Sequence, residues 1–195
     1  KSKYSENLDL SNKEKFNLNL QTILNQIKQI ENLVNEFSDF ARMPKPLFKK
    51  NDLLKIISLN LELLKKIDPN IDIKIDRKDK LYINCDYEQI SRVFFNLVKN
   101  SIESINEKVE KTSNINKIID IEIKERRDYI ILNISDNGIG FPNINAKDLI
   151  KPYYTTKQKG SGLGLSIVNK IINDHNGKIE FKPIKQGAEV KILFN

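Results

Sequence analysis

Apolar residues near the start of the chain recur at alternating intervals of four and three residues. This spacing predicts a long helix with one apolar seam, of the kind that packs against other helices in a bundle. Such a helix is seldom stable alone, so the seam implies either a partner helix or docking on the chain's own domain. Two prolines, Pro44 and Pro46, end the pattern. The seam consists of Phe16, Leu20, Ile23, Ile27, Ile30, Val34, Phe37 and Ala41.

After residue 44 the pattern alternates between helical stripes and short strands with an apolar residue at every second position. Asp86 and Gln89 resemble a capping box at the start of the longest helix. This order of elements predicts an α/β sandwich, in which one mixed sheet packs against helices on one face. The predicted helices cover 51–67, 86–105 and 165–174; the predicted strands cover 71–75, 80–84, 119–124, 129–135, 178–181 and 188–194; the polar segment 107–116 is expected to be a loop.

The composition fits one globular domain with a helical extension. Of the 195 residues, 39% are hydrophobic and 30% are charged, which suffices for one packed core and a charged surface. The apolar runs are too short to cross a bilayer, and no secretory signal pattern opens the chain. A single cysteine, Cys85, excludes an internal disulfide, is compatible with a reducing cytoplasm and, with one histidine, argues against a zinc site.

The formal charge of +7 raises the question of nucleic-acid binding. The lysines are spread along the chain and mixed with 26 acidic residues, and no compact basic stripe with interleaved aromatic residues is present in the sequence. We therefore favour a solvated lysine-rich surface over a nucleic-acid-binding one.

Two asparagines, Asn96 and Asn100, lie one turn apart at the rim of the buried face of the longest predicted helix. Asparagine is a mediocre helix former, so a pair in mid-helix usually has a functional reason. An amide oxygen can bind Mg²⁺ without adding charge, which leaves room for phosphate oxygens and water. The alternative is two solvated asparagines in an asparagine-rich protein.

Asp136 stands at the end of a predicted strand and is followed by Gly138 and Gly140. A carboxylate there can accept a hydrogen bond from the exocyclic amine of adenine, which guanine does not offer at the same edge, and the glycines clear space for a flat ring. The Asn-Gly pair in this stretch also favours a turn. A turn alone requires neither the second glycine nor the preceding aspartate.

The stretch 151–166 combines hydroxyls, a lysine and glycines. Thr155, Thr156 and Lys157 can reach phosphate oxygens, and the glycine-rich run 160–164 leads into a helix whose N-terminus favours anions. The run is not a P-loop, which needs Gly-Lys-Ser/Thr, nor a dinucleotide fingerprint, which follows the first strand of a βαβ unit. The alternatives are a polar loop and a flexible hinge.

In this order and spacing, the segments resemble the N, G1, F and G2 boxes of the ATP-binding catalytic domain of sensor histidine kinases, in the superfamily shared with gyrase, Hsp90 and MutL. The resemblance extends from about residue 47 to the end, where Gly187 is similar to a terminal glycine element. The segment 35–46 (NEFSDFARMPKP) resembles the one that joins the dimerisation helices to this domain in nitrogen-regulation sensors of the NtrY/NtrB type. The boxes correspond to 96–100, 136–140, 152–157 and 160–164.

The resemblance implies a Bergerat-type ATP-binding fold with ATP and Mg²⁺ as ligands. Asp136 would bind the adenine amine, with Gly138 and Gly140 shaping the base pocket. Asn100 would hold Mg²⁺, with Asn96 and Lys99 as neighbouring catalytic residues. The triphosphate would be covered by a short lid that contains Tyr154, Thr155, Thr156, Lys157, Gly160, Ser161, Gly162, Leu163 and Gly164.

The chain departs from the family pattern in two respects. Lys151 stands where the F box usually has glutamate before proline. The only histidine, His175, lies at a helix end where family members often carry His-Gly, and it is not expected to be the phosphoacceptor. Related hydrolases carry a glutamate where Asn96 stands, so this domain is expected to keep ATP intact until a histidine arrives.

The resemblance further implies that residues 1–43 are part of a dimerisation segment without its acceptor helix, and that 44–195 form the catalytic domain. The expected partners are the acceptor histidine helix of the same or a partner protomer, a response regulator and a second copy bound through the heptad helix, but not nucleic acid. This piece is expected to be cytoplasmic, although full-length relatives are often anchored to the inner membrane. A non-catalytic ATP-binding or partner-binding module remains the alternative, which Lys151 and the missing acceptor leave open.

Overall fold

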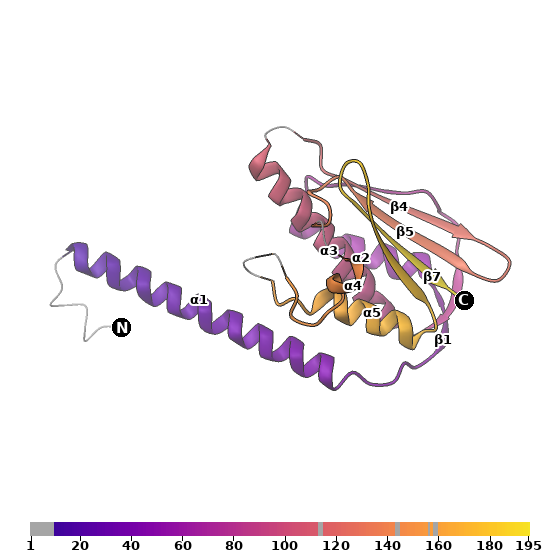
Figure 1. Cartoon of the computed structure of the whole chain (residues 1–195), viewed down its shortest axis with the longest axis horizontal. Helices are drawn as coiled ribbons and strands as arrows, with labels where there is room; N and C mark the ends of the chain where they lie inside the picture. The colour runs from indigo at the N-terminus through magenta and orange to yellow at the C-terminus, as the bar shows by residue number, and fades with distance from the viewer. Residues whose placement is uncertain (1–9, 113–114, 143–144, 156, 158–159) are drawn as a thin grey trace. The chain divides into compact units, whose positions relative to one another are not determined.

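The computed structural model of the chain describes residues 10–112, 115–142, 145–155, 157 and 160–195 (Figure 1). The described residues form two compact units. The first contains the residues up to Met43 together with Lys157, Gly160 and Ser161, and the second contains the remaining described residues from Pro44 to Asn195.

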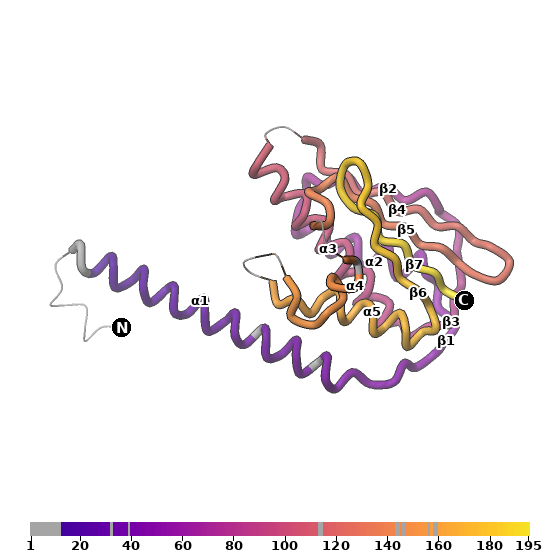
Figure 2. Tube along the Cα trace, viewed as in Figure 1, coloured from indigo at the N-terminus to yellow at the C-terminus, as the bar shows by residue number. Residues whose placement is uncertain are grey.

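The first unit is built around helix α1, Leu10–Ala41, which is indigo and violet in Figure 2. The helix predicted from the heptad seam is therefore present, and it begins before the first seam residue, Phe16. It ends shortly before Pro44, which cannot continue a helix. The seam is exposed on α1: Ile23, Ile27 and Ile30 retain between 51% and 61% of their accessible surface.

The second unit contains a five-stranded sheet with the order β2-β4-β5-β7-β6. Strands β2 and β4 pair in parallel and the other neighbours pair antiparallel, so the sheet is mixed. Helices α2, α3 and α5 lie together on one face of it (Figure 1). This is the predicted two-layer sandwich. The strands are β2 Asp72–Ile75, β4 Ile118–Glu125, β5 Ile130–Asp136, β6 Lys178–Pro183 and β7 Ala188–Phe194.

The core lies between the sheet and these helices. Along β7, buried residues alternate with half-buried ones, as expected for a sheet with one covered face. Phe94 and Ile102 on α3 are almost fully buried, as are Ile121 and Ile134 on the central strands. The four helices of this unit are α2 Leu53–Ile67, α3 Tyr87–Lys111, α4 Ala146–Leu149 and α5 Gly164–Asp174.

Two short elements and one helix end differ from the prediction. Strand β1, Lys49–Asp52, was not predicted; it pairs antiparallel with β3, Tyr82–Cys85, in a separate two-stranded sheet. The single turn α4 was also missed. Helix α3 continues past Ile105 to Lys111, into the segment expected to be a loop, because these polar residues extend the helix with pairs such as Glu107–Lys111 at 2.7 Å.

The predicted capping box at the start of α3 is only half formed. Asp86 Oδ1 accepts the backbone N–H of Gln89 at 3.0 Å, as predicted. The Gln89 side chain instead donates to the Pro44 carbonyl at 3.0 Å, and the Asp86 N–H donates to His175 Nε2 at 3.0 Å. Asp86 Oδ2 also accepts the Leu47 N–H at 2.8 Å. The second bond of the capping box is thus replaced by long-range hydrogen bonds. Those to Pro44 and Leu47 hold the segment that begins the second unit.

An ion pair joins the end of α2 to the segment before β4. Lys117 Nζ lies 2.6 Å from Asp68 Oδ2, and the two side chains are 21% and 7% exposed. Burial raises the pKa of Asp68, but the hydrogen bond from Lys117, the Asn70 N–H and the charge of Lys117 outweigh it, so the pKa is below its ordinary value.

We predict that Lys117→Gln lowers the free energy of unfolding at pH 7 by about 1–2 kcal/mol, because it leaves a mostly buried carboxylate without its cation. A folded-state pKa below the unfolded value, about 3.9, gives stability that is present above that value and lost as the pH falls through the folded pKa. The difference from the parent should therefore shrink as the pH falls below the unfolded value. Urea unfolding followed by circular dichroism, at pH 7 and at a series of acidic pH values, tests this. Lys80→Gln, at an exposed lysine, is the control, and an equal loss at every pH would contradict the prediction.

Candidate functional site

The asparagine pair predicted from the sequence lies on α3 beside the start of α5. Asn96 and Asn100 are half-buried, whereas Lys99 is exposed. The Nζ atom of Lys99 lies 3.9 Å from Glu103 Oε1. The Nδ2 atom of Asn100 is 4.0 Å from the position that a Cβ on Gly164 would occupy. The amide of Asn100 therefore lies next to the first residue of α5.

The N-terminus of α5 is suited to an anionic ligand. Its N-cap position holds Leu163, a fully buried residue whose side chain makes no capping hydrogen bond. The first-turn N–H groups of a helix have no partner within the helix, and the helix dipole places partial positive charge there. With the Asn100 amide close by, this helix end offers both backbone donors and a neutral amide to the same ligand.

Asp136 ends β5, and its carboxylate is buried, with the residue only 7% exposed. Its Oδ1 accepts the N–H of Gly138 at 2.9 Å, and its Oδ2 accepts the hydroxyl of Ser101 at 3.0 Å. The backbone N–H of Ala188 also interacts with it. A carboxylate offers about four acceptor positions, so Asp136 retains acceptor capacity for a ligand donor.

The electrostatics of Asp136 favour a ligand that donates a hydrogen bond. Burial raises the pKa of Asp136 above its ordinary value, although the Gly138 N–H, the Ser101 hydroxyl, the Ala188 N–H and the charge of Lys108 oppose this shift. Lys108 is held nearby, because its Nζ donates to the Asn137 carbonyl at 2.6 Å. A buried acceptor with a perturbed pKa is typical of a functional site.

The loop after Asp136 follows α3 closely. A Cβ on Gly138 would collide with Ser104, whose hydroxyl accepts the N–H of Ile139 at 3.1 Å. Gly140 has φ +80°, and a Cβ there would lie 2.8 Å from the Gly187 carbonyl oxygen. Both glycines thus have a packing reason to be glycine, in addition to the ring clearance expected from the sequence.

The predicted lid is divided between the two units. In the second unit, Tyr154 is half-buried and Thr155 is exposed. A Cβ on Gly162 would lie 2.8 Å from the Tyr153 Cα. The backbone at Tyr153, just before the predicted lid, is therefore in close contact with the backbone at Gly162. Of the other predicted lid residues, Leu163 and Gly164 lead into α5, Thr156 lies outside the described residues, and Lys157, Gly160 and Ser161 belong to the first unit.

His175 is buried at the end of α5, and both of its ring nitrogens are engaged. Nε2 accepts the Asp86 N–H at 3.0 Å, so Nδ1 carries the proton and donates to the Ile171 carbonyl at 2.8 Å. The ring also contacts Phe48, with ring centroids 5.1 Å apart. A phosphoacceptor needs an accessible nitrogen lone pair, so this geometry supports the sequence inference that His175 is not the acceptor.

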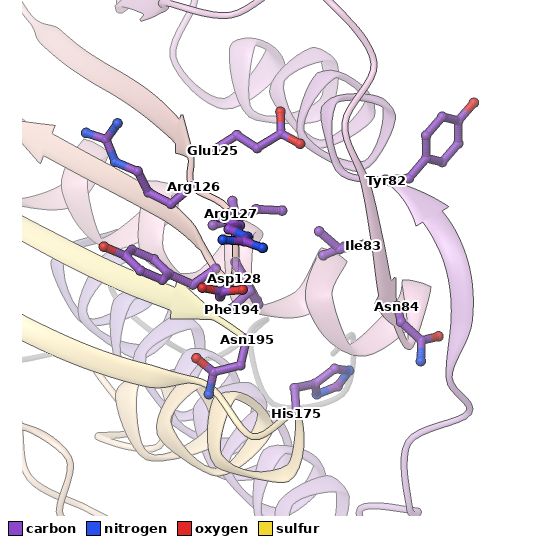
Figure 3. Close-up of a pocket in the computed structure, with 12 residues that line it drawn as sticks. Tyr82, Ile83, Asn84, Glu125, Arg126, Arg127, Asp128, His175, Phe194 and Asn195 are labelled. Carbon is purple, nitrogen blue, oxygen red and sulfur yellow. The ribbon is translucent and has the colours of Figure 1, made fainter.

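A separate hollow of about 240 Å³ lies between β3, the β4–β5 turn and the end of β7 (Figure 3). Ile83, Arg127 and His175 are among its lining residues, and none of the predicted ATP-site residues lines it. The hollow therefore does not coincide with the site on α3 and α5.

The family follows from comparison with known proteins. Residues 85–195 match the model of the histidine kinase-, DNA gyrase B- and HSP90-like ATPases, which is more than half of the chain. The chain belongs to this ATPase family. Membership implies ATP binding and confirms the resemblance found in the sequence.

Two curated relatives are similar over most of the chain. Nitrogen regulation protein NtrY of Azorhizobium caulinodans is 33% identical over 175 residues, which are 90% of this chain and 23% of that protein. A putative NtrY-like sensor histidine kinase of Rickettsia felis is 33% identical over 189 residues, which are 96% of this chain and 31% of that protein. The chain thus spans less than a third of the length of these relatives.

Solved structures of histidine kinases have the same fold. Histidine kinase ThkA in complex with the response regulator TrrA superposes with a TM-score of 0.74 and 25% identity, over 97% of this chain and 53% of that one. A nucleotide-free catalytic domain of ThkA superposes with a TM-score of 0.64 and 28% identity, over 76% and 95%. The predicted fold class is therefore confirmed. Among the residues that the structure describes, no helix is long and apolar enough to span a membrane.

We predict that Asp136→Asn weakens ATP binding by about ten- to a hundredfold, because an amide cannot accept from Gly138, Ser101 and a ligand amine as a carboxylate does. Isothermal titration calorimetry with ATP and Mg²⁺ measures the effect. Asp120→Asn, at an exposed aspartate on β4, should bind ATP like the parent. Unchanged affinity in the Asp136 variant would show that this carboxylate does not contact the base.

Proposed function

We propose that this chain is the ATP-binding catalytic part of a sensor histidine kinase of the NtrY type. It transfers the γ-phosphoryl group of ATP to a histidine outside this chain, for relay to a response regulator. The main support is the arrangement of two consecutive residues on α3: Ser101 bonds to the buried Asp136, and Asn100 lies beside Gly164 at the start of α5. Helix α3 therefore contacts both the carboxylate that would accept a hydrogen bond from the base and the helix end that would bind the phosphates.

In this proposal the nucleotide extends along α3. The adenine amine donates to Asp136, next to Gly138 and Gly140. The phosphates face the N-terminus of α5, with Asn96, Lys99 and Asn100 on the α3 side. The proposed lid residues that the structure describes in this unit are Tyr154, Thr155, Gly162, Leu163 and Gly164.

The amide oxygen that α3 offers as a ligand fits a magnesium ion that is bound mainly by phosphate. Mg²⁺ prefers oxygen ligands and usually retains several water molecules, so one protein oxygen beside the phosphates is sufficient. Asn100 supplies a neutral amide oxygen in a half-buried position. No group of three His, Cys, Asp or Glu residues able to hold a metal is found among the described residues, so phosphate and water would complete the coordination. When bound, the ion neutralises charge on the phosphates.

In the proposed reaction an imidazole nitrogen of the acceptor forms a bond to the γ-phosphorus while the bridging P–O bond breaks, and ADP leaves. Phosphoryl transfer requires mainly positioning and charge neutralisation, and we propose that Lys99, Asn100 and the α5 N-terminus supply them. Position 96 is an amide, which is not a base for activating water. His175 has no nitrogen available, so the acceptor comes from a separate helix.

We assign residues 1–43 to part of a dimerisation segment and 44–195 to the catalytic domain. The apolar seam of α1 is the surface through which two copies would associate, because an exposed heptad seam is stabilised by burial against other helices.

A second candidate is a non-catalytic ATP-binding switch of the same superfamily. It is favoured by Lys151, which replaces the usual glutamate before the F-box proline and pairs with Asp148 Oδ1 at 2.6 Å. In that case ATP would bind without phosphoryl transfer.

The kinase proposal predicts that the protein, mixed with ATP, Mg²⁺ and a separately produced acceptor-helix fragment from an NtrY-type protein, forms acid-labile, alkali-stable phosphohistidine on the fragment. Asn100→Ala should lower the rate by about a hundredfold or more, because it removes the amide beside the phosphates. Asn173→Ala, at an exposed residue of α5, should match the parent. ATP binding without any phosphohistidine would favour the switch.

The dimerisation proposal predicts concentration-dependent self-association in sedimentation equilibrium. The double variant Ile23→Glu/Ile27→Glu should shift the protein to monomer, because it places charges in the seam. Leu18→Glu, at an exposed position outside the seam, is the matched control and should associate like the parent. A parent protein that stays monomeric at high concentration would refute the proposal.

A further inference from the structure

We propose that Ser101 is a positioning residue for adenine recognition: its hydroxyl holds the Asp136 carboxylate in the orientation that accepts the 6-amino group of the base. It acts through Asp136 and need not touch the nucleotide. This inference rests on the proposed function of the site, in which Asp136 binds adenine.

The hydrogen bonds of the Asp136 carboxylate support this role of Ser101. The Ser101 hydroxyl donates to Asp136 Oδ2 at 3.0 Å, and the two residues are 6% and 7% exposed. The other carboxylate oxygen, Oδ1, is held by the N–H of Gly138 in the following loop. The carboxylate is thus held by one side chain, from α3, and by the backbone N–H groups of Gly138 and Ala188. Without the bond from α3, only these backbone contacts would orient it, and it could turn more freely because the last torsion of an aspartate has a broad minimum.

Two other serines on the helices of this unit, Ser58 on α2 and Ser166 on α5, bond only within their own helix or at its start. Ser58 Oγ donates to the Leu54 carbonyl and Ser166 Oγ donates to the Leu163 carbonyl, each at 2.8 Å and within or at the start of its own helix. This local bond is the usual one for a serine in a helix. Ser101, in contrast, reaches from α3 across to the end of β5. Its bond therefore joins two elements of the site.

The hydrogen bond from Ser101 also favours the ionised form of Asp136, which can accept a hydrogen bond from the base. Burial raises the pKa of Asp136, and the Ser101 hydroxyl is one of the groups that oppose this rise. The charged group that faces the carboxylate is Lys108, which also favours the ionised form. Removal of the hydroxyl should favour the protonated carboxyl, whose O–H competes with the amine of adenine as a donor.

The test is a thermodynamic cycle between Ser101 and the 6-amino group. Affinities for ATP and for purine riboside 5′-triphosphate, which lacks this amine, are measured by calorimetry with Mg²⁺ for the parent, Ser101→Ala and Ser101→Cys. Cysteine keeps nearly the volume of serine but is a weak donor, which guards against a packing defect in the alanine variant. Ser58→Ala removes the hydroxyl of a helix serine that bonds only to its own helix, and it is the control.

The parent should prefer ATP over the analogue by about ten- to a hundredfold. Both Ser101 variants should lose about tenfold in ATP affinity and little in analogue affinity, so that the preference shrinks by about tenfold. The ATP affinity of Ser101→Ala should also begin to fall at a higher pH than that of the parent as the solution is acidified. Ser58→Ala should retain both parental affinities.

The outcomes separate the two proposals. A parent with no preference for ATP would refute the adenine assignment of Asp136, and the inference with it. A preference that persists unchanged in both Ser101 variants would overturn the inference alone. Equal losses for the two nucleotides would also overturn it, because they would assign Ser101 a purely structural role.

Discussion

The packing of α3 against the loop after β5 is the constraint on which the candidate site depends. Ser101 and Ser104 lie about one turn apart on α3, and they bond to the Asp136 carboxylate and to the Ile139 N–H. Polar groups buried in a low-dielectric interior are costly unless they are paired, so these bonds fix the loop relative to the helix. Because Asn100 is on the same helix, a rigid element sets the spacing between the two ends of the site.

The fold was predictable from the sequence where one face of an element is buried. Helix α2 and strand β7 have clear apolar periodicity, and both formed, although α2 begins at Leu53 because Asn51 and Asp52 belong to β1. Strand β1 was missed because its residues, KKND, are polar, and its pairing with β3 depends on backbone hydrogen bonds that leave no mark on the sequence. Tertiary contacts also override local rules: Gln89 resembles a capping partner, but its side chain bonds to Pro44 instead.

The residues of the candidate site could be proposed from the sequence, but the contacts that hold them in place could not. The carboxylate Asp136 and the amide Asn100 stand in short motifs, which can be found without a structure. Ser101, Ser104 and Lys108 act on residues that are about thirty positions away or more along the chain, a distance over which no local pattern extends. A signal was nevertheless present for Ser101, because it falls on the apolar face of α3, and a buried hydroxyl implies a hydrogen-bond partner.

The burial of Asp136 lowers stability in a way that serves selectivity in the proposed function. Its raised pKa means that the ionised form is less stable in the fold than in water. An amine that donates to the carboxylate relieves part of this cost, whereas a purine with an acceptor at the same edge adds repulsion. An unpaired buried polar group costs about 1–3 kcal/mol, which corresponds to about ten- to a hundredfold in binding. The bonds from Gly138 and Ser101 make the arrangement tolerable without a ligand, because they stabilise the charge but leave acceptor capacity for the base.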